Sequence, residues 1–201
     1  KRPLLMGYRG SIGARYAAIL KSLGVDFFGV EVDDPVPPFI YDSVIIATPT
    51  HMHCEHVMAF ADQQTPILLE KPLSTDLKQA LEICDMLDQA NTPVRMVNQY
   101  RHITAAFGTG ETAYDYYRSG KDGLHWDTIS LIALATGDVS LKQESPYWQA
   151  TLNGKELTHR MVERAYIDMI EHFLSDPPTS PETDYMRMAH KKAAAFGWSS
   201  R

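Results

Sequence analysis

The sequence has no apolar run close to the roughly 20 residues that a membrane-spanning helix needs. It has only two cysteines, Cys54 and Cys84, without disulfide-type spacing, so we expect free thiols in a reducing cytoplasm. Basic residues are outnumbered, and the net charge of -6 argues against nucleic acid or an anionic membrane as the partner. The basic pair Lys1-Arg2 is not followed by the apolar stretch of a signal peptide, which also favours a cytoplasmic location.

The first half of the chain alternates between two periodicities. Short apolar segments predict strands at residues 4–7, 27–32, 43–47, 66–70 and 93–98. Between them, apolar residues at helical spacing predict helices at 12–23, 53–63 and 74–90, the last with Ser74 as its N-cap. This repetition with short links indicates an α/β fold with a Rossmann-type, doubly wound parallel sheet.

The second half breaks this rhythm. Helices are expected at residues 111–118, 125–135, 157–174 and 182–196, and strands at 139–144 and 147–157, with Asn153-Gly154 as a hairpin turn. Residues 33–42 carry three prolines and leave no room for a helix, so one crossover is expected to be an extended loop. We therefore expect a dinucleotide-binding Rossmann domain at 1–102 and a small, reduced α+β domain at 103–201, whose closing helices pack back on the first.

A glycine-rich segment follows the first strand and opens the first helix. Gly10 and Gly13 have the spacing of the last two glycines in a dinucleotide-binding loop, where a pyrophosphate lies at a helix N-terminus. Gly7 stands three residues before Gly10 instead of two, so the motif alone is equally compatible with a tight turn that binds nothing. Asp33 follows about 20 residues after Gly13, where a carboxylate binds the adenosine ribose and favours NAD over NADP. Glu31 takes that role if the strand register differs by two.

Three histidines follow the third strand. His51, His53 and His56 come within one residue of a zinc motif of metallo-hydrolases, although the parallel strand pattern argues against such a hydrolase. The alternative is a ligand-binding loop over residues 48–50, at the carboxyl end of a strand, or simply exposed histidines in a first helical turn.

The tripeptide Glu70-Lys71-Pro72 follows the fourth strand on the same edge of the sheet. A lysine here can hydrogen-bond a substrate hydroxyl and assist its deprotonation. A solvated Glu-Lys pair is the plainer interpretation of these residues alone.

Taken in order, GSIGARY, VIIATPTHMHCEHV, EKPLS and VNQYRH resemble the N-terminal motifs of the glucose–fructose oxidoreductase/inositol dehydrogenase (Gfo/Idh/MocA) family. The resemblance covers residues 3–102 except the loop at 33–42. In the second half, KDGLHWD resembles the family's catalytic segment, with His125 at the histidine position and Asp122 three residues before it, one place out of step. Most of the family's large second-domain sheet has no counterpart here.

The resemblance implies an NAD(P)-dependent oxidoreductase that moves a hydride between a nicotinamide and a hydroxyl-bearing carbon of a sugar, cyclitol or nucleotide sugar. His125 would take the hydroxyl proton, Asp122 would orient it, and Lys71, before a proline bond that is often cis in the family, would bind the hydroxyl. The residues expected to contact the cofactor, NAD in preference to NADP, are Gly10, Ser11, Ile12, Gly13, Asp33, Thr48, Pro49, His53, Glu70 and Asn98.

Other functions stay open at this point. A non-catalytic dinucleotide-binding or sensor protein would bind the cofactor without turnover, and a zinc hydrolase would use His51, His53 and His56. A reduced sheet exposes its edge strands, which favours a homo-oligomer, with a dimer as the first expectation.

Overall fold

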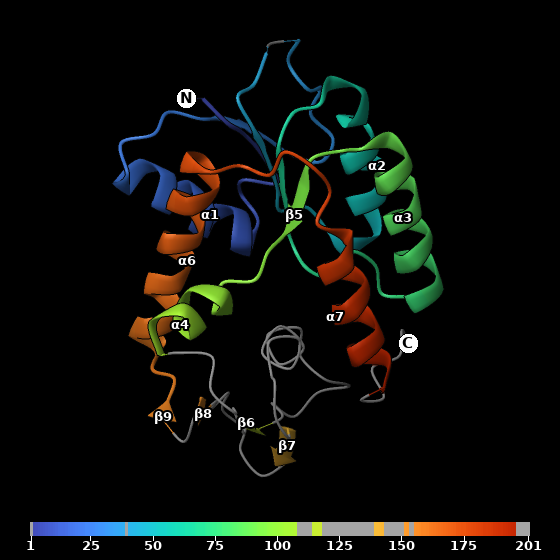
Figure 1. Cartoon of the computed structure of the whole chain (residues 1–201). Coiled ribbons are helices and arrows are strands. Elements are labelled where there is room, and N and C mark those ends of the chain that lie inside the picture. The colour runs from blue at the N-terminus through green and yellow to red at the C-terminus, as the bar shows by residue number, and fades with distance from the viewer. Residues whose placement is uncertain are drawn as a thin grey trace. The chain divides into compact units, whose positions relative to one another are not determined.

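The computed structural model describes residues 2–38, 40–107, 114–117, 139–142, 151–152 and 155–195 (Figure 1). The chain divides into two compact units: Lys1–Val97 with Ile170–Arg187, and Asn98–Met169 with Met188–Arg201. The first unit thus includes a segment from near the end of the sequence. The division expected at residue 102 remains a proposal about domains.

The first unit is built on a five-stranded parallel sheet with the strand order β2-β1-β3-β4-β5. All four strand pairings are parallel, and every residue of β1, β3 and β4 is buried, as expected for strands covered on both faces. The predicted Rossmann-type α/β fold is therefore confirmed. The strands are β1 (Leu4–Met6), β2 (Phe28–Val30), β3 (Val44–Ile46), β4 (Ile67–Leu69) and β5 (Val94–Met96).

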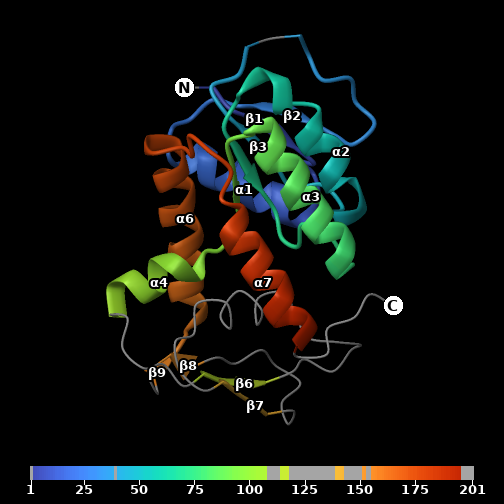
Figure 2. The same ribbon diagram turned by 45° about the vertical axis from the view of Figure 1, so that its right-hand side comes forward.

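Helices cover both faces of this sheet. In Figure 1, α1 (Ser11–Ser22) lies on one side of the strands, and α2 (His53–Met58) and α3 (Leu77–Ala90) lie on the other. The turned view in Figure 2 also shows α2 and α3 side by side. Right-handed crossovers require this arrangement, because the chain moves from β1 in one direction to β2 and from β3 in the other to β4 and β5.

Two helix ends differ from the sequence prediction. The N-cap of α3 is Asp76, whose carboxylate accepts the N–H of Gln79 at 2.8 Å, and not Ser74. The Ser74 hydroxyl instead accepts the N–H of Asp76, so Ser74 lies two residues before the N-cap. The helix predicted over residues 53–63 ends at Met58 and is followed by a separate 3-10 turn, η2 (Ala61–Gln63).

The connection from β2 to β3 passes over β1 through residues 31–43, which form no helix or strand in the part of the chain that the structure describes, as the prolines predicted. Tyr41 fixes its far end: the hydroxyl donates to the carbonyl oxygen of Pro37 at 2.5 Å, and the ring meets Phe28 edge-on with centroids 5.6 Å apart. Compared with the Rossmann order 3-2-1-4-5-6, the described residues form no strand outside β2.

Two long helices near the end of the chain confirm the predicted periodicity, α6 (His159–Ser175) and α7 (Thr183–Ala195). The start of α7 is bound to α3 within the first unit. The Thr183 hydroxyl donates to Asp88 at 2.6 Å, and Arg187 donates to Asp85 and Asp88 at 2.7 and 2.6 Å. Burial raises the pKa of Asp88, but these hydrogen bonds outweigh it and lower the pKa overall.

The second unit contains α4 (Tyr100–Phe107) and two small sheets. β6 (Tyr114–Tyr117) pairs in parallel with β7 (Val139–Lys142), so the helix predicted at 111–118 is wrong. The segment Tyr-Asp-Tyr-Tyr is rich in aromatic residues, which favour strands. β8 (Thr151–Leu152) and β9 (Lys155–Glu156) pair antiparallel around residues 153–154, as the hairpin signal predicted. The helix predicted at 125–135 lies outside the described residues.

None of the helices in the described ranges is long and apolar enough to cross a membrane.

Candidate functional site

Four loops meet at the carboxyl edge of the parallel sheet, because the strands that precede them all run in the same direction. They follow β1, β2, β3 and β4 and contain, in that order, the glycine segment, the acidic turn, the threonine–histidine segment and the Glu-Lys-Pro tripeptide. The strand order reverses between β1 and β3, because β2 is added on one side of β1 and β3 to β5 are added on the other. Doubly wound sheets bind ligands at such a switch point.

A tight turn accommodates the extra residue between Gly7 and Gly10. Gly7 adopts a φ of 73°, and its carbonyl oxygen accepts the N–H of Gly10 at 3.1 Å. A side chain on Gly7 would approach the carbonyl oxygen of Ala47 to 2.7 Å. The extra residue between the glycines therefore lengthens the loop without moving Gly10 from the start of α1.

Gly10 and Gly13 have different surroundings. A Cβ on Gly13 would lie 1.9 Å from the carbonyl oxygen of Gly7, so this glycine permits the tight packing of α1 against the loop. A Cβ on Gly10 would meet only that same oxygen, at 3.3 Å, and Gly10 is exposed. No side chain caps the first turn of α1, and the N–H groups of Ser11 and Ile12 have no hydrogen-bond partner among the described residues, as an anion site requires.

The acidic turn after β2 faces the glycine loop. Glu31 directly follows the strand, and its carboxylate accepts the N–H of Arg9 at 2.7 Å. The Glu31 N–H in turn donates to Asp34 at 2.9 Å, which fixes the start of the turn. Asp33 lies two residues further on and is exposed. The register that favours Glu31 over Asp33 arises because β2 ends at Val30, earlier than the predicted 32.

The loop after β3 is held together by two buried histidines. The ring of His53 contacts the carbonyl oxygens of Pro72 at 2.7 Å and Thr48 at 2.9 Å, so it joins the loop after β3 to the loop after β4. His56 Nδ1 and the Thr48 hydroxyl are hydrogen-bonded at 2.8 Å. Pro49 and His51 are exposed on the same segment.

These contacts do not support a zinc site. Both ring nitrogens of His53 face main-chain carbonyls, and Nδ1 of His56 is occupied by Thr48. Among the described residues, which include all three histidines of the motif, no group of three or more His, Cys, Asp or Glu side chains is arranged to hold a metal ion. The contacts of His53 and His56 therefore do not fit the zinc-hydrolase alternative.

The burial of His53 predicts a pH dependence of stability. Burial lowers the pKa of His53 below 6.5, and the two carbonyl contacts oppose this shift without cancelling it. The unfolded chain thus binds a proton that the folded chain does not, so the free energy of unfolding should fall as the pH drops below about 6.5 toward the folded pKa. The loss is about 1.4 kcal/mol for each unit of pKa difference.

Urea unfolding between pH 5 and 8 would measure this loss, with His53→Gln as the matched variant. Glutamine can donate to one carbonyl but does not titrate, so the variant should show a flatter profile in this window. An unchanged pH profile in His53→Gln would show that His53 is not the group responsible.

Glu70 is a buried carboxylate at the end of β4. It accepts a hydrogen bond from the hydroxyl of Tyr16, which is fully buried on α1, and from the N–H of Lys71 at 3.0 Å. The peptide bond between Lys71 and Pro72 is cis, and Lys71 is half-buried. Tyr16, which lies within the helix predicted at 12–23, was not singled out from the sequence. The available signal was that a buried tyrosine hydroxyl needs a partner.

Three predicted site residues, Asn98, Asp122 and His125, do not belong to these four loops. Asn98 follows β5 by two residues and belongs to the second unit, where its side-chain oxygen accepts the N–H of Tyr100 at 3.1 Å. His125 and Asp122 lie outside the described residues, so their predicted roles stay predictions.

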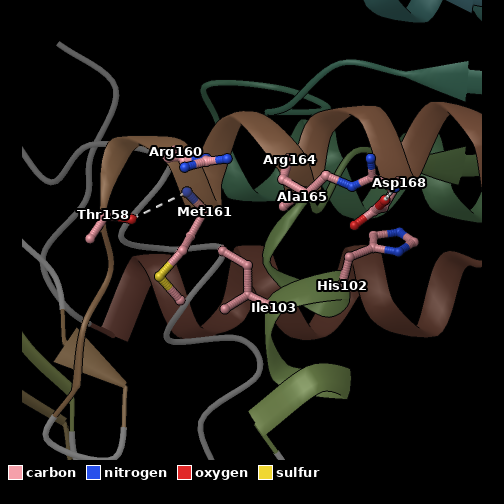
Figure 3. Close-up of a pocket in the computed structure, with 8 residues that line it drawn as sticks. All are labelled: His102, Ile103, Thr158, Arg160, Met161, Arg164, Ala165 and Asp168. Carbon is pink, nitrogen blue, oxygen red and sulfur yellow. Dashed lines mark hydrogen bonds and ion pairs between the residues drawn. The ribbon is translucent and has the colours of Figure 1, made fainter. Parts of the chain in front are cut away.

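A pocket of about 330 Å³ lies within the second unit, between side chains of α4 and α6 (Figure 3). An ion pair of 2.7 Å between Arg164 and Asp168 lies on its α6 wall, and Thr158 accepts the N–H of Met161 at 3.3 Å. No predicted site residue lines it, and the charge of Arg164 is already balanced, so we do not assign the chemistry to this pocket. Its lining residues are His102, Ile103, Thr158, Arg160, Met161, Arg164, Ala165 and Asp168.

Comparison with known proteins agrees with this geometry. Residues 10–98 match the family model described as Gfo/Idh/MocA, "Oxidoreductase family, NAD-binding Rossmann fold". An inositol 2-dehydrogenase of Mycolicibacterium gilvum is 34% identical over 77 residues, which are 35% of this chain and 22% of that protein. A second inositol 2-dehydrogenase, from Mycolicibacterium smegmatis, is 38% identical over 56 residues, 28% of this chain and 16% of that protein. The matched segment thus spans about a fifth of the length of these relatives.

Solved structures extend the likeness of fold to nearly the whole chain. A myo-inositol dehydrogenase from Corynebacterium glutamicum aligns with a TM-score of 0.72 and 14% identity, over 99% of this chain and 96% of that one. The WlbA (WbpB) dehydrogenase from Thermus thermophilus, solved with NAD and UDP-GlcNAcA, aligns with a TM-score of 0.65 and 13% identity, over 100% and 95%. These solved structures show a shared fold, and residues 10–98 are similar to the NAD-binding Rossmann domain of the Gfo/Idh/MocA oxidoreductase family.

Proposed function

We propose that this chain is an NAD(P)-dependent oxidoreductase acting on a CH–OH group of a sugar, cyclitol or nucleotide sugar. The observation that carries the proposal is the open start of α1. Gly10 is exposed, leaves space for a ligand where any other residue would place a side chain, and precedes a helix turn without a side-chain cap. A pyrophosphate fits these features because they combine free N–H donors with the positive end of a helix.

The residues at the sheet edge fit a dinucleotide. The N–H groups of Ser11 and Ile12 would bind the pyrophosphate, with Gly10 allowing its approach, while Gly13 lets α1 pack closely. Glu31, in preference to the predicted Asp33, would bind the adenosine ribose, which favours NAD. Thr48, Pro49, Glu70 and Asn98 remain proposed contacts of the nicotinamide half. His53 would act indirectly, by fixing the two loops that it joins.

Lys71 and His125 would have different roles in the reaction of the substrate. The bound nicotinamide would supply or accept the hydride. Lys71 would donate a hydrogen bond to the reacting hydroxyl and hold it in place, and His125 would accept its proton, oriented by Asp122. Hydrogen bonds from Tyr16 and from the N–H of Lys71 hold the Glu70 carboxylate in one position. A fixed carboxylate suits its proposed contact with the nicotinamide half.

The substrate class rests on the relatives. The curated relatives bear the name inositol 2-dehydrogenase, and one structural neighbour was solved with a nucleotide sugar. A polyol with adjacent hydroxyl groups is therefore the first class to test. Among the described residues no strand pairs with the outer edge of β2, which supports the further proposal that the chain forms a homo-oligomer, because an unpaired edge strand invites association.

Replacing Lys71 by methionine tests the catalytic part of this proposal. The assay follows NADH formation from NAD⁺ with myo-inositol and a panel of sugars and nucleotide sugars. We expect kcat to fall by roughly a hundredfold in Lys71→Met, because the positioned donor for the hydroxyl is lost. NADH affinity should stay within about twofold of the wild type, as expected for a residue that binds substrate and not the adenosine half.

Other outcomes are equally informative. An unchanged kcat in Lys71→Met would remove Lys71 from the mechanism. NADH binding without turnover of any polyol, or of the corresponding ketones in reverse, would contradict the enzyme proposal and indicate a dinucleotide-binding protein.

A further inference from the structure

The two residues between Gly7 and Gly10, Tyr8 and Arg9, hold a guanidinium against the Tyr8 ring, while the main chain of Arg9 contacts the acidic turn. The Tyr8 ring packs on Gly29 of β2 so closely that a Cβ there would lie 2.8 Å from it. Arg9 Nε donates to the Tyr8 hydroxyl at 2.9 Å, and its guanidinium carbon lies 5.1 Å from the centre of the Tyr8 ring. The main chain of Arg9 is held as well, by its N–H bond to Glu31.

Most of the hydrogen-bonding capacity of Arg9 is unused. Guanidinium has five N–H donors, of which Nε supplies one. The two terminal nitrogens have no partner among the described residues, and the side chain is exposed. Arginine with free terminal nitrogens binds phosphate through paired, charge-assisted hydrogen bonds.

The negative charge of Glu31 would repel a phosphate group bound next to Arg9. Its carboxylate lies against the Arg9 main chain, and Asp33 and Asp34 follow in the same turn. Three carboxylates against one guanidinium leave a local excess of negative charge, which would repel a phosphate group and leave the ribose hydroxyls of NAD as the better ligand.

We propose that Arg9 and Glu31 together read the adenosine 2′ position: Arg9 is a preformed contact for a 2′-phosphate, and Glu31 prevents its use. This inference rests on the proposed function, since it assumes that a nicotinamide dinucleotide binds at the sheet edge. Its consequence is that one substitution on the acidic turn gives the protein an NADP site, because the arginine is already in place.

The test is a fluorescence titration with NADH and NADPH of the wild type, Glu31→Gln, Arg9→Met and the double variant. The wild type should bind NADH more tightly. Glu31→Gln keeps the shape and the acceptor for the Arg9 N–H but removes the charge, so NADPH affinity should rise at least about tenfold. The gain should disappear in Arg9→Met/Glu31→Gln, and it should shrink as salt is added. Arg9→Met alone should change NADH affinity by less than about twofold, because the hydrogen bond of Arg9 to Glu31 comes from the main chain and survives the substitution.

Failure of the inference is distinguishable from failure of the proposed function. If NADH binds the wild type but Glu31→Gln gains no NADPH affinity, or keeps the gain without Arg9, the inference is overturned and the function stands. A wild type that prefers NADPH also overturns it. If every variant is folded by circular dichroism and none binds either dinucleotide, the proposed function falls first.

Discussion

Valine in place of Gly10 is expected to abolish dinucleotide binding without unfolding the protein. The backbone of Gly10 has φ −63° and ψ 163°, which any residue can adopt, and a Cβ there approaches only the Gly7 carbonyl oxygen. The added side chain would therefore project into the open space where a pyrophosphate has to approach the N–H groups of α1. We expect NADH affinity to fall by more than a hundredfold, measured by fluorescence titration.

Thermal unfolding supplies the control for Gly10→Val. The melting temperature should lie within a few degrees of the wild type, as it should for the smaller change Gly10→Ala. Full NADH affinity in a folded Gly10→Val would mean that the dinucleotide does not pass Gly10, and the proposed site would be wrong.

Alanine in place of Gly13 is expected to have the opposite profile, a large loss of stability. Its Cβ would lie 1.9 Å from the Gly7 carbonyl oxygen and 2.8 Å from the Tyr8 Cα, and both are main-chain atoms. Neither can move aside without shifting α1 from the sheet or opening the glycine turn. Overpacking typically costs about 1–3 kcal/mol, and against rigid main chain we expect more than about 3 kcal/mol, measured by urea unfolding.

The pair Gly10→Ala and Gly13→Ala adds the same methyl group three residues apart, so their difference isolates the packing. A Gly13→Ala variant as stable as Gly10→Ala would contradict the close contact between α1 and the loop.

The glycine loop shows how far sequence reasoning reaches. The spacing of Gly10 and Gly13 after a strand was sufficient to predict a helix N-terminus at the carboxyl edge of a parallel sheet. It could not decide whether the displaced Gly7 breaks the motif, because that depends on a turn hydrogen bond from Gly10 back to Gly7. The turn adds one residue to the loop and leaves the start of α1 in place.

Register was the weaker part of the prediction. The end of β2 was expected at 32 and lies at Val30, and this difference moves the first acidic residue after the strand from Asp33 to Glu31. Strand ends depend on where the ladder hydrogen bonds stop, which the apolar pattern of a three-residue strand does not specify. The helix predicted at 111–118 was wrong for a related reason: the apolar spacing was compatible with both structures, and β6 formed by pairing with β7, distant in sequence.

Contacts between distant segments could not be predicted at all. The hydrogen bond from Tyr16 to Glu70 spans 54 residues, and the ring of His53 joins carbonyl oxygens of two loops. His53 was expected to contact the cofactor, and only the three-dimensional structure shows that both of its ring nitrogens face main-chain carbonyl oxygens.

The part of the chain that the structure describes has no strand outside β2, and this leaves the ligand-binding edge of the sheet unchanged. A described sheet with the order β2-β1-β3-β4-β5 has one strand fewer beyond β2 than the Rossmann order, but it keeps the switch point between β1 and β3. The features proposed to bind the pyrophosphate and the ribose all follow β1 and β2. Shortening the β2–β3 connection to an extended loop is therefore compatible with a complete dinucleotide site.

The measurement that tests this most directly is titration of the purified wild-type protein with NADH and NADPH, followed by fluorescence. We predict saturable binding at one site per chain, tighter for NADH, and absent from folded Gly10→Val. No binding of either dinucleotide by the folded wild-type protein would contradict the assignment of the sheet edge as a nicotinamide dinucleotide site.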